Sequence, residues 1–134
     1  MKKSKGITLI ELMIVVVIVA IIVSIAYPSY QEQIRKTRRS DAQSALMDAA
    51  ARMERFYTQY GRYTSTIADA GIVATGPEFY QITAGTIANQ TFILRASPIV
   101  GSAQEGDNCG SFDIDQAQVK NVSGSFSGQA CAWE

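Results

Sequence analysis

One carboxylate, Glu11, lies inside an apolar run of 21 residues that extends from Ile7 to Tyr27 and contains no other charged side chain. Placing an ionised carboxylate well inside a bilayer costs about 3 kcal/mol, so such an acid marks a functional site and requires a cationic partner. The run supplies none, because the nearest basic side chains are Lys5 before it and Arg35 after it.

Cleavage of the chain after Gly6 creates the missing positive charge. The new α-amino group on Ile7 lies one helical turn before Glu11 and is free to pair with the Glu11 of a neighbouring subunit. If the chain is cut there, between Gly6 and Ile7, then Ile7 and Glu11 are expected to act together in assembly.

The apolar run is long enough to cross a membrane, because a helix of its length spans about 31 Å. Its apolar residues fall on all sides, which indicates burial all round in lipid or in an assembly. Two other interpretations stay open, namely a simple permanent anchor and a secretory signal peptide cut at Ser24-Ile25-Ala26. The position of Glu11 counts against both.

The composition argues against catalysis. The 134 residues make about one domain, and 12 basic and 12 acidic side chains give no net charge, with no histidine. Without histidine, the commonest general base and the commonest metal ligand are missing. We therefore expect no catalytic residue, no metal and no cofactor. The charge is uneven, with +3 over residues 1–6 and −5 over residues 63–134, and nucleic acid is not expected as a partner.

The elements that position these residues begin with one long helix from Ile7 to Tyr60, which we expect to kink at Pro28 and to stop at Gly61. Its second half carries an apolar stripe at steps of three and four residues. The stripe consists of Ile34, Ala42, Ala45, Leu46, Ala49, Met53, Phe56 and Tyr60, and the other face carries Arg38, Arg39, Asp41, Asp48, Arg52 and Arg55.

Short strands follow the helix. A connecting loop with a helical turn at Ser65–Ala70 leads into four segments with strand patterns. These are Phe79–Thr83, Gln90–Ala96, Ser111–Asp115 and Gln118–Val122. Short strands in sequence order after one long helix predict an α+β head, in which an antiparallel sheet packs on the apolar stripe.

Two cysteines, Cys109 and Cys131, complete the head. Two thiols that follow a membrane-targeting segment indicate one disulfide formed outside the cytoplasm. It closes a loop of 23 residues, worth about 3 kcal/mol in the chain-entropy model. We expect the loop to hold the chain end, including Trp133, against the sheet.

Two patterns carry a resemblance to a known family. The first is the segment KKSKG-ITLIELMIVVVIVAIIVSIAYPSY, a basic leader ending in Gly, then Ile-Thr-Leu-Ile-Glu and an apolar run. The second is Cys-Gly, an alternating strand, a Lys near a Ser-Gly turn, then Cys and Trp. Both resemble type IV pilins with a class III signal, and the second is most similar to PilE-like minor pilins. The family usually begins its mature chain with Phe, where this chain has Ile7.

The resemblance implies a role for each part of the chain. A leader of residues 1–6 is removed by prepilin peptidase, Ile7 is N-methylated, and Glu11 is needed for processing or assembly. Residues 7–30 form the membrane and assembly half of the helix. Residues 31–134 form the head, with helix to about residue 60, a loop to about 77 and then the sheet and disulfide region.

The implied function is that of a structural pilus subunit, not an enzyme. The chain would stay in the inner membrane with a periplasmic head and then enter an extracellular type IV pilus. Its partners would be other pilin subunits, prepilin peptidase and the pilus assembly machinery, and the pilus would support twitching motility and adhesion.

Two alternatives use the same helix. A pseudopilin of a type II secretion system would bind calcium in its head, for which Asp107, Asp113 and Asp115 are the candidate ligands. A DNA-receptor pilin for natural transformation would use either the basic cluster between Arg35 and Arg39 or scattered basic side chains of the head. The cluster otherwise forms a solvated face beside the membrane.

Overall fold

The computed structural model of the 134-residue chain describes residues 6–74, 76–124, 131 and 133. The predicted leader therefore lies outside the described residues, except for Gly6. The chain separates into two compact units, residues 1–34 and residues 35–134, and each unit is described by itself. The predicted division at residue 30 stays a prediction.

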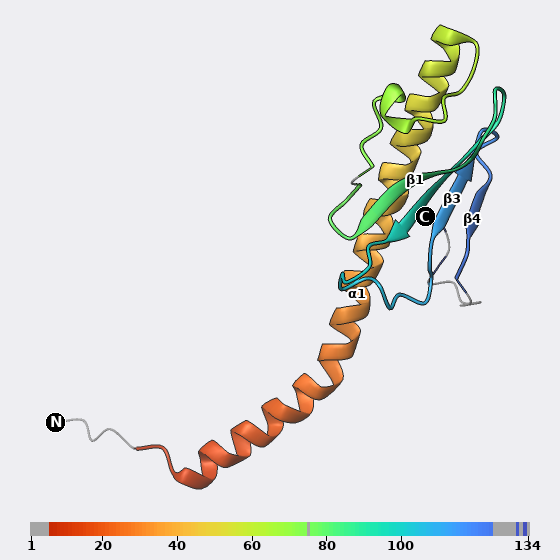
Figure 1. The fold of residues 1–134 in the computed structure, drawn as a ribbon. Helices are drawn as coiled ribbons and strands as arrows, with labels where there is room; N and C mark the ends of the chain where they lie inside the picture. The colour runs from red at the N-terminus through yellow and green to blue at the C-terminus, as the bar shows by residue number, and fades with distance from the viewer. Residues whose placement is uncertain (1–5, 75, 125–130, 132, 134) are drawn as a thin grey trace. The chain divides into compact units, whose positions relative to one another are not determined.

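A single long helix, α1, extends over Leu9–Tyr60 (Figure 1). It begins two residues after the predicted start because Thr8 caps it, with the backbone N–H of Glu11 donating to Thr8 Oγ1 at 3.3 Å. It ends as predicted at Gly61, whose φ of 68° is left-handed and whose N–H donates to the Tyr57 carbonyl at 2.7 Å.

In the first unit, the large apolar side chains between Ile7, just before α1, and Tyr30 are all exposed, by 51% at Ile18 to 78% at Ile7, whereas Ile34 at the end of the unit is half-buried. Among the described residues, α1 is the one helix long and apolar enough to cross a membrane. The helix does not end at Pro28, which lies inside it. The kink expected at Pro28 stays a prediction.

The second unit contains a four-stranded antiparallel sheet, as the sequence predicts. The strands pair in sequence order, so that each strand is hydrogen-bonded to the one that follows it. The elements after α1 are the 3₁₀ turn η1 at Ile67–Ala70, β1 at Tyr80–Ile87, β2 at Phe92–Pro98, β3 at Phe112–Asp115 and β4 at Lys120–Val122.

One face of this sheet packs on the second half of α1 and forms the core (Figure 1). Alternate residues of each strand point inward because the side-chain period of a strand is two. The sheet contributes Tyr80, Ile82, Phe92, Leu94, Ala96, Phe112 and Ile114, and the helix contributes Ala42, Leu46, Ala49, Ala50 and Met53. The α+β fold is therefore confirmed.

The apolar stripe of the helix is shorter than predicted. Tyr60 was expected in the core but is 64% exposed. The reason is that the chain reverses at Gly61 and places Tyr63 in the core instead, with its ring 4.9 Å from that of Phe92. The last turn of α1 thus carries an exposed aromatic side chain.

The disulfide joins Cys109 and Cys131, as predicted. It holds the chain end near the sheet, where the Trp133 indole N–H donates to the Asn121 carbonyl of β4 at 3.2 Å. The Trp133 ring also meets that of Phe112 edge-on, with centroids 5.8 Å apart. At the other side of the sheet, the Ile82 N–H of β1 donates to the Ala74 carbonyl at 2.8 Å.

Removing the disulfide should destabilise the head. The double variant Cys109→Ser/Cys131→Ser should lose about 3 kcal/mol of unfolding free energy, because the unfolded chain regains the entropy of an open loop. Urea unfolding of the full chain in detergent micelles, followed by Trp133 fluorescence, measures this. Equal midpoints for the double variant and the oxidised parent would contradict the prediction.

Candidate functional site

A buried ion pair joins Arg39 of α1 to Asp107 of the loop between β2 and β3. The Arg39 guanidinium donates through Nε to Oδ2 at 2.7 Å and through its second nitrogen to Oδ1 at 2.5 Å. The exposed fractions of the two side chains are 6% and 0%. This two-bond geometry is the strongest form of a charge-assisted hydrogen bond.

Three further donors complete the shell of the Asp107 carboxylate. The Tyr80 hydroxyl lies at 3.2 Å from Oδ2 and the Gln104 amide nitrogen at 2.9 Å, while the Cys109 N–H lies at 3.4 Å from Oδ1. Gln104 also donates to the Arg35 carbonyl at 3.4 Å. The cluster therefore joins α1, β1 and the loop that leads to the disulfide.

The surroundings of Asp107 favour its ionised form. Burial acts to raise the pKa of this carboxyl, but the hydrogen bonds and positive charge of Arg39 outweigh it and hold the pKa below its ordinary value. Burial is also the main cause that raises the pKa of Tyr80 above its ordinary value. Both groups are thus fixed, one charged and the other neutral, at neutral pH.

These contacts correct two sequence expectations. Arg39 was placed on the polar face of the helix, but it is buried. Asp107 and Asp113 were candidate calcium ligands, but each faces an arginine, since Arg95 donates to Asp113 at 2.7 Å through two nitrogens. Paired carboxylates of this kind make a poor ligand set for a cation.

The basic cluster between Arg35 and Arg39 is also divided. Arg39 is held by Asp107, and the Arg38 guanidinium lies 3.8 Å from the centre of the Phe79 ring, just before β1. These two side chains fasten the helix to the head, so the cluster does not form a uniform solvated face.

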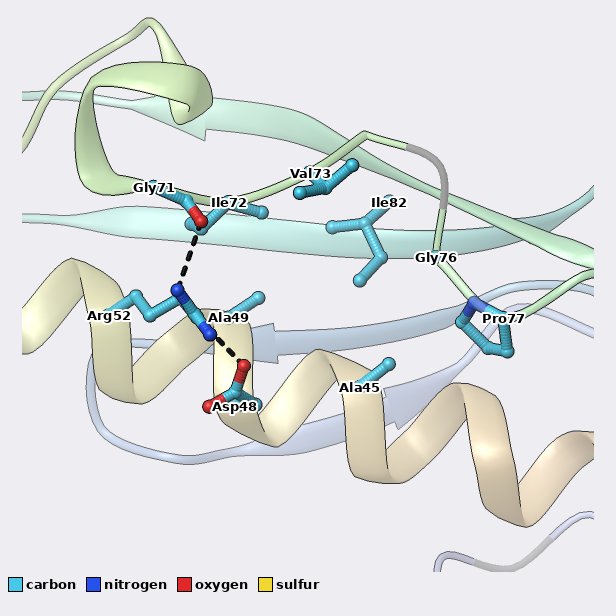
Figure 2. A pocket seen from close by; sticks show the side chains of 10 residues that line it. All are labelled: Ala45, Asp48, Ala49, Arg52, Gly71, Ile72, Val73, Gly76, Pro77 and Ile82. Atoms are coloured by element: carbon cyan, nitrogen blue, oxygen red, sulfur yellow. Dashed lines mark hydrogen bonds and ion pairs between the residues drawn. The ribbon is translucent and has the colours of Figure 1, made fainter.

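A hollow of about 190 Å³ lies between α1 and the segment before β1 (Figure 2). Arg52 crosses one end of it, donating to Asp48 at 2.8 Å and to the Gly71 carbonyl at 3.1 Å. Ala45, Ala49 and Ile82 line the rest. Arg52 therefore attaches the loop to the helix. Because its charge is neutralised by Asp48, the hollow offers little charge to a ligand.

Beyond Arg52, one arginine on α1 and one just after its end lack an acidic partner among the described residues. Arg55 and Arg62 are exposed, and neither makes an ion pair within the described part of the chain. They border two neighbouring hollows that share one wall residue, Asp69. The Asp69 carboxylate accepts a hydrogen bond from the Thr64 hydroxyl at 3.2 Å.

The predicted processing and assembly residues belong to the first unit. Gly6 and Ile7 precede α1, and Glu11 lies in its first turn, where the partial positive charge of a helix N-terminus favours a carboxylate. Thr8 and Glu11 also match the spacing of a capping box, a signal that our sequence analysis missed.

Two models of known protein families match this chain, one over its N-terminal segment and the other over most of the remainder. A family model described as the prokaryotic N-terminal methylation motif covers residues 1–27. A second, described as "Type IV minor pilin ComP, DNA uptake sequence receptor", covers residues 28–113, more than half of the chain.

Relatives and solved structures agree with these matches. Fimbrial protein EcpC of Eikenella corrodens is 38% identical over 71 residues, covering 53% of this chain and 46% of that protein. Type IV major pilin protein PilE1 of Neisseria gonorrhoeae is 33% identical over 70 residues, covering 52% and 42%. The chain thus spans less than half the length of these relatives.

The non-core minor pilin PilV of Neisseria meningitidis has a TM-score of 0.62 at 19% identity, covering 77% of this chain and 99% of that one. A type IV pilin from Shewanella oneidensis has a TM-score of 0.55 at 24% identity, covering 75% and 99%. At these identities the likeness shows the fold alone.

The methylation motif, the long helix, the antiparallel sheet and the disulfide define a type IV pilin. Within that class, the chain belongs to the family of the type IV minor pilin ComP, a family described as DNA uptake sequence receptors. Family and fold are those of structural pilins and not of enzymes.

Breaking the buried pair from one side should be strongly destabilising. Asp107→Leu leaves the Arg39 charge buried without its partner and should cost about 3–5 kcal/mol, whereas Arg39→Met/Asp107→Leu should recover much of that loss. Urea unfolding of the full chain in micelles measures both variants. Equal stability of the single and double variants would contradict the role of the pair.

The same pair predicts an effect of pH. Because the folded pKa of Asp107 is below its unfolded value, its contribution is complete above the ordinary carboxyl pKa. It is lost as the pH falls through the folded value. The parent should therefore lose more stability on acidification than Arg39→Met/Asp107→Leu does.

Proposed function

We propose that this chain is a minor subunit of a type IV pilus that polymerises through the first half of α1. The observation that carries the proposal is the exposure of the large apolar side chains between Ile7 and Tyr30, combined with one carboxylate in the first helical turn. A surface of this kind requires lipid before assembly and like helices afterwards.

The proposed assembly contact is electrostatic and depends on processing. Prepilin peptidase cuts between Gly6 and Ile7, and the new, N-methylated amine of Ile7 pairs with Glu11 of a neighbouring subunit. In an apolar surrounding, either charge alone is expensive, so a subunit in the wrong register is rejected. The capped helix end holds Glu11 in place for this pairing, and Pro28 supplies the kink that lets the helix pack among its neighbours.

The proposal also places the parts of the chain. Residues 1–6 lie in the cytoplasm, residues 7–30 cross the inner membrane and the head of residues 31–134 lies in the periplasm until the subunit enters the pilus. Extension and retraction are driven by the assembly machinery, and the pilus supports motility and adhesion. A secretion pseudopilin is the weaker alternative, because Asp107 and Asp113 are already bound by arginines.

We further propose that the head binds DNA. From the sequence, a DNA receptor is an alternative that the net charge of the head counts against, whereas membership of the ComP family favours it. The position of individual charges matters more here than the net charge of the head, because a phosphate interacts mainly with charges within a Debye length of about 8 Å. Among the described arginines from Arg39 onward, three are neutralised by aspartates, namely Arg39, Arg52 and Arg95, and we take the other two, Arg55 and Arg62, as the phosphate ligands.

Both arginines lie where the chain reverses at the end of α1. Arg62 borders a polar hollow of about 380 Å³ formed with Thr64, Thr66 and Asn89, which brings the loop after α1 beside the turn between β1 and β2. The same hollow contains Asp69, whose charge opposes a phosphate. The arginines therefore attract DNA to this surface, and the Asp69 carboxylate weakens that attraction.

Glu11→Gln should prevent assembly while leaving the chain in the membrane. The neutral amide keeps the size of the side chain but cannot pair with the Ile7 amine, so the amount of this subunit in sheared pili should fall at least about tenfold. Glu32→Gln removes a carboxylate just beyond the apolar run and serves as the control.

Intact-mass measurement completes this test. The parent and the control should both show loss of residues 1–6 and one added methyl group. A parent that keeps its leader, is cut after Ala26 or never enters a filament would contradict the proposal, as would normal pilus content of Glu11→Gln.

Removing phosphate contacts should weaken DNA binding and its dependence on salt. Arg55→Gln and Arg62→Gln should each reduce the slope of log affinity against log salt by about 1, whereas Asp69→Asn should tighten binding. Fluorescence anisotropy of a labelled duplex with the full chain in micelles measures this. Arg95→Gln removes the same charge from a neutralised pair, and an equal effect there would rule out the assigned surface.

A further inference from the structure

The last turn of α1 carries an aromatic pair that the core does not use. The rings of Phe56 and Tyr60 lie 4.4 Å apart with an angle of 33° between their planes. Phe56 is half-buried, but Tyr60 is 64% exposed. An exposed ring already stacked on a second ring offers a flat, ordered apolar surface at little cost in conformational entropy.

This pair forms part of a shallow hollow of about 160 Å³ between the end of α1 and the 3₁₀ turn η1. We call it the aromatic cleft, and its other walls include Arg52, Arg55, Gln59 and Asp69. Arg52 is held by Asp48 and Gly71, so Arg55 is the one arginine of the described cleft without an ion pair. An aromatic surface beside an uncompensated cation suits a planar ring attached to an anion.

Gln59 adds hydrogen-bonding groups to the rim of the cleft. An amide both donates and accepts, which matches the polar edge of a nucleobase. A purely hydrophobic partner would leave these groups unsatisfied, whereas a nucleotide uses the ring surface, the edge groups and the cation together.

Resting on the proposed DNA binding, we propose that the aromatic cleft holds one unpaired nucleobase stacked on Tyr60, with Arg55 on its phosphate. A base inside a duplex has neighbours on both faces and cannot lie flat on a side chain. The ligand is therefore a nucleotide at a duplex end, in a single strand or turned out of the helix. Each base stacked on an aromatic side chain contributes about 1–3 kcal/mol.

The experiment uses the full chain in detergent micelles and two DNA probes of equal length, a single strand and a closed hairpin duplex, each containing 2-aminopurine. The single strand should bind with quenched fluorescence, and Tyr60→Leu should weaken that binding about 5- to 150-fold and abolish the quenching. Tyr60→Phe keeps the ring and should bind like the parent.

The outcomes separate the cleft from DNA binding in general. Unchanged binding and quenching in Tyr60→Leu, or loss in Tyr60→Phe equal to that in Tyr60→Leu, would overturn the aromatic cleft while leaving salt-dependent duplex binding intact. Failure of both probes to bind at any salt concentration would overturn DNA binding itself and the cleft with it, whereas failure of the single strand alone would overturn only the cleft. Equal urea midpoints for the parent and both Tyr60 variants show that folding is unaffected.

Discussion

The bidentate ion pair between Arg39 and Asp107 is the constraint on which the organisation of the head depends. It is formed between residues 68 apart in sequence and excluded from water. By fixing the loop after β2 to the helix, it also fixes Cys109, two residues further on, and through the disulfide the position of the chain end. A buried pair contributes little stability over an apolar replacement, but it penalises any packing that separates its charges. Its main effect is therefore to make the helix and sheet meet in one arrangement.

The chain contains a second costly carboxylate, and the contrast with Asp107 explains the proposed assembly. Asp107 has four donors from its own chain, and its pKa is held below the ordinary value. Glu11 has a helix N-terminus near it but no cation in the apolar run. One acid is satisfied by folding alone, and the other, in our proposal, only by a neighbouring molecule. The same physical rule thus gives a stable head in one place and a polymerising surface in the other.

Much of the fold follows from local pattern, but the long-range pairs do not. The alternation of Phe112 and Ile114 predicted β3, and the two cysteines predicted their disulfide. Arg39 continues the apolar stripe three residues before Ala42, a signal of burial that its charge obscured, and nothing local identifies Asp107 as its partner. Tyr60 was misplaced because periodicity cannot show where the sheet beneath a helix ends. Arg55 and Arg62 stood out only after the structure had assigned aspartates to Arg39, Arg52 and Arg95.

Hydrogen bonds from outside the sheet occupy a backbone group on each of its two edge strands, β1 and β4. Unpaired strand edges recruit further strands and lead to aggregation. On β4, the Asn121 carbonyl is already occupied by the Trp133 indole, and on β1 the Ile82 N–H is occupied by the Ala74 carbonyl. These two groups are therefore not free to bind an added strand, which in our proposal favours the apolar helices as the route by which copies associate.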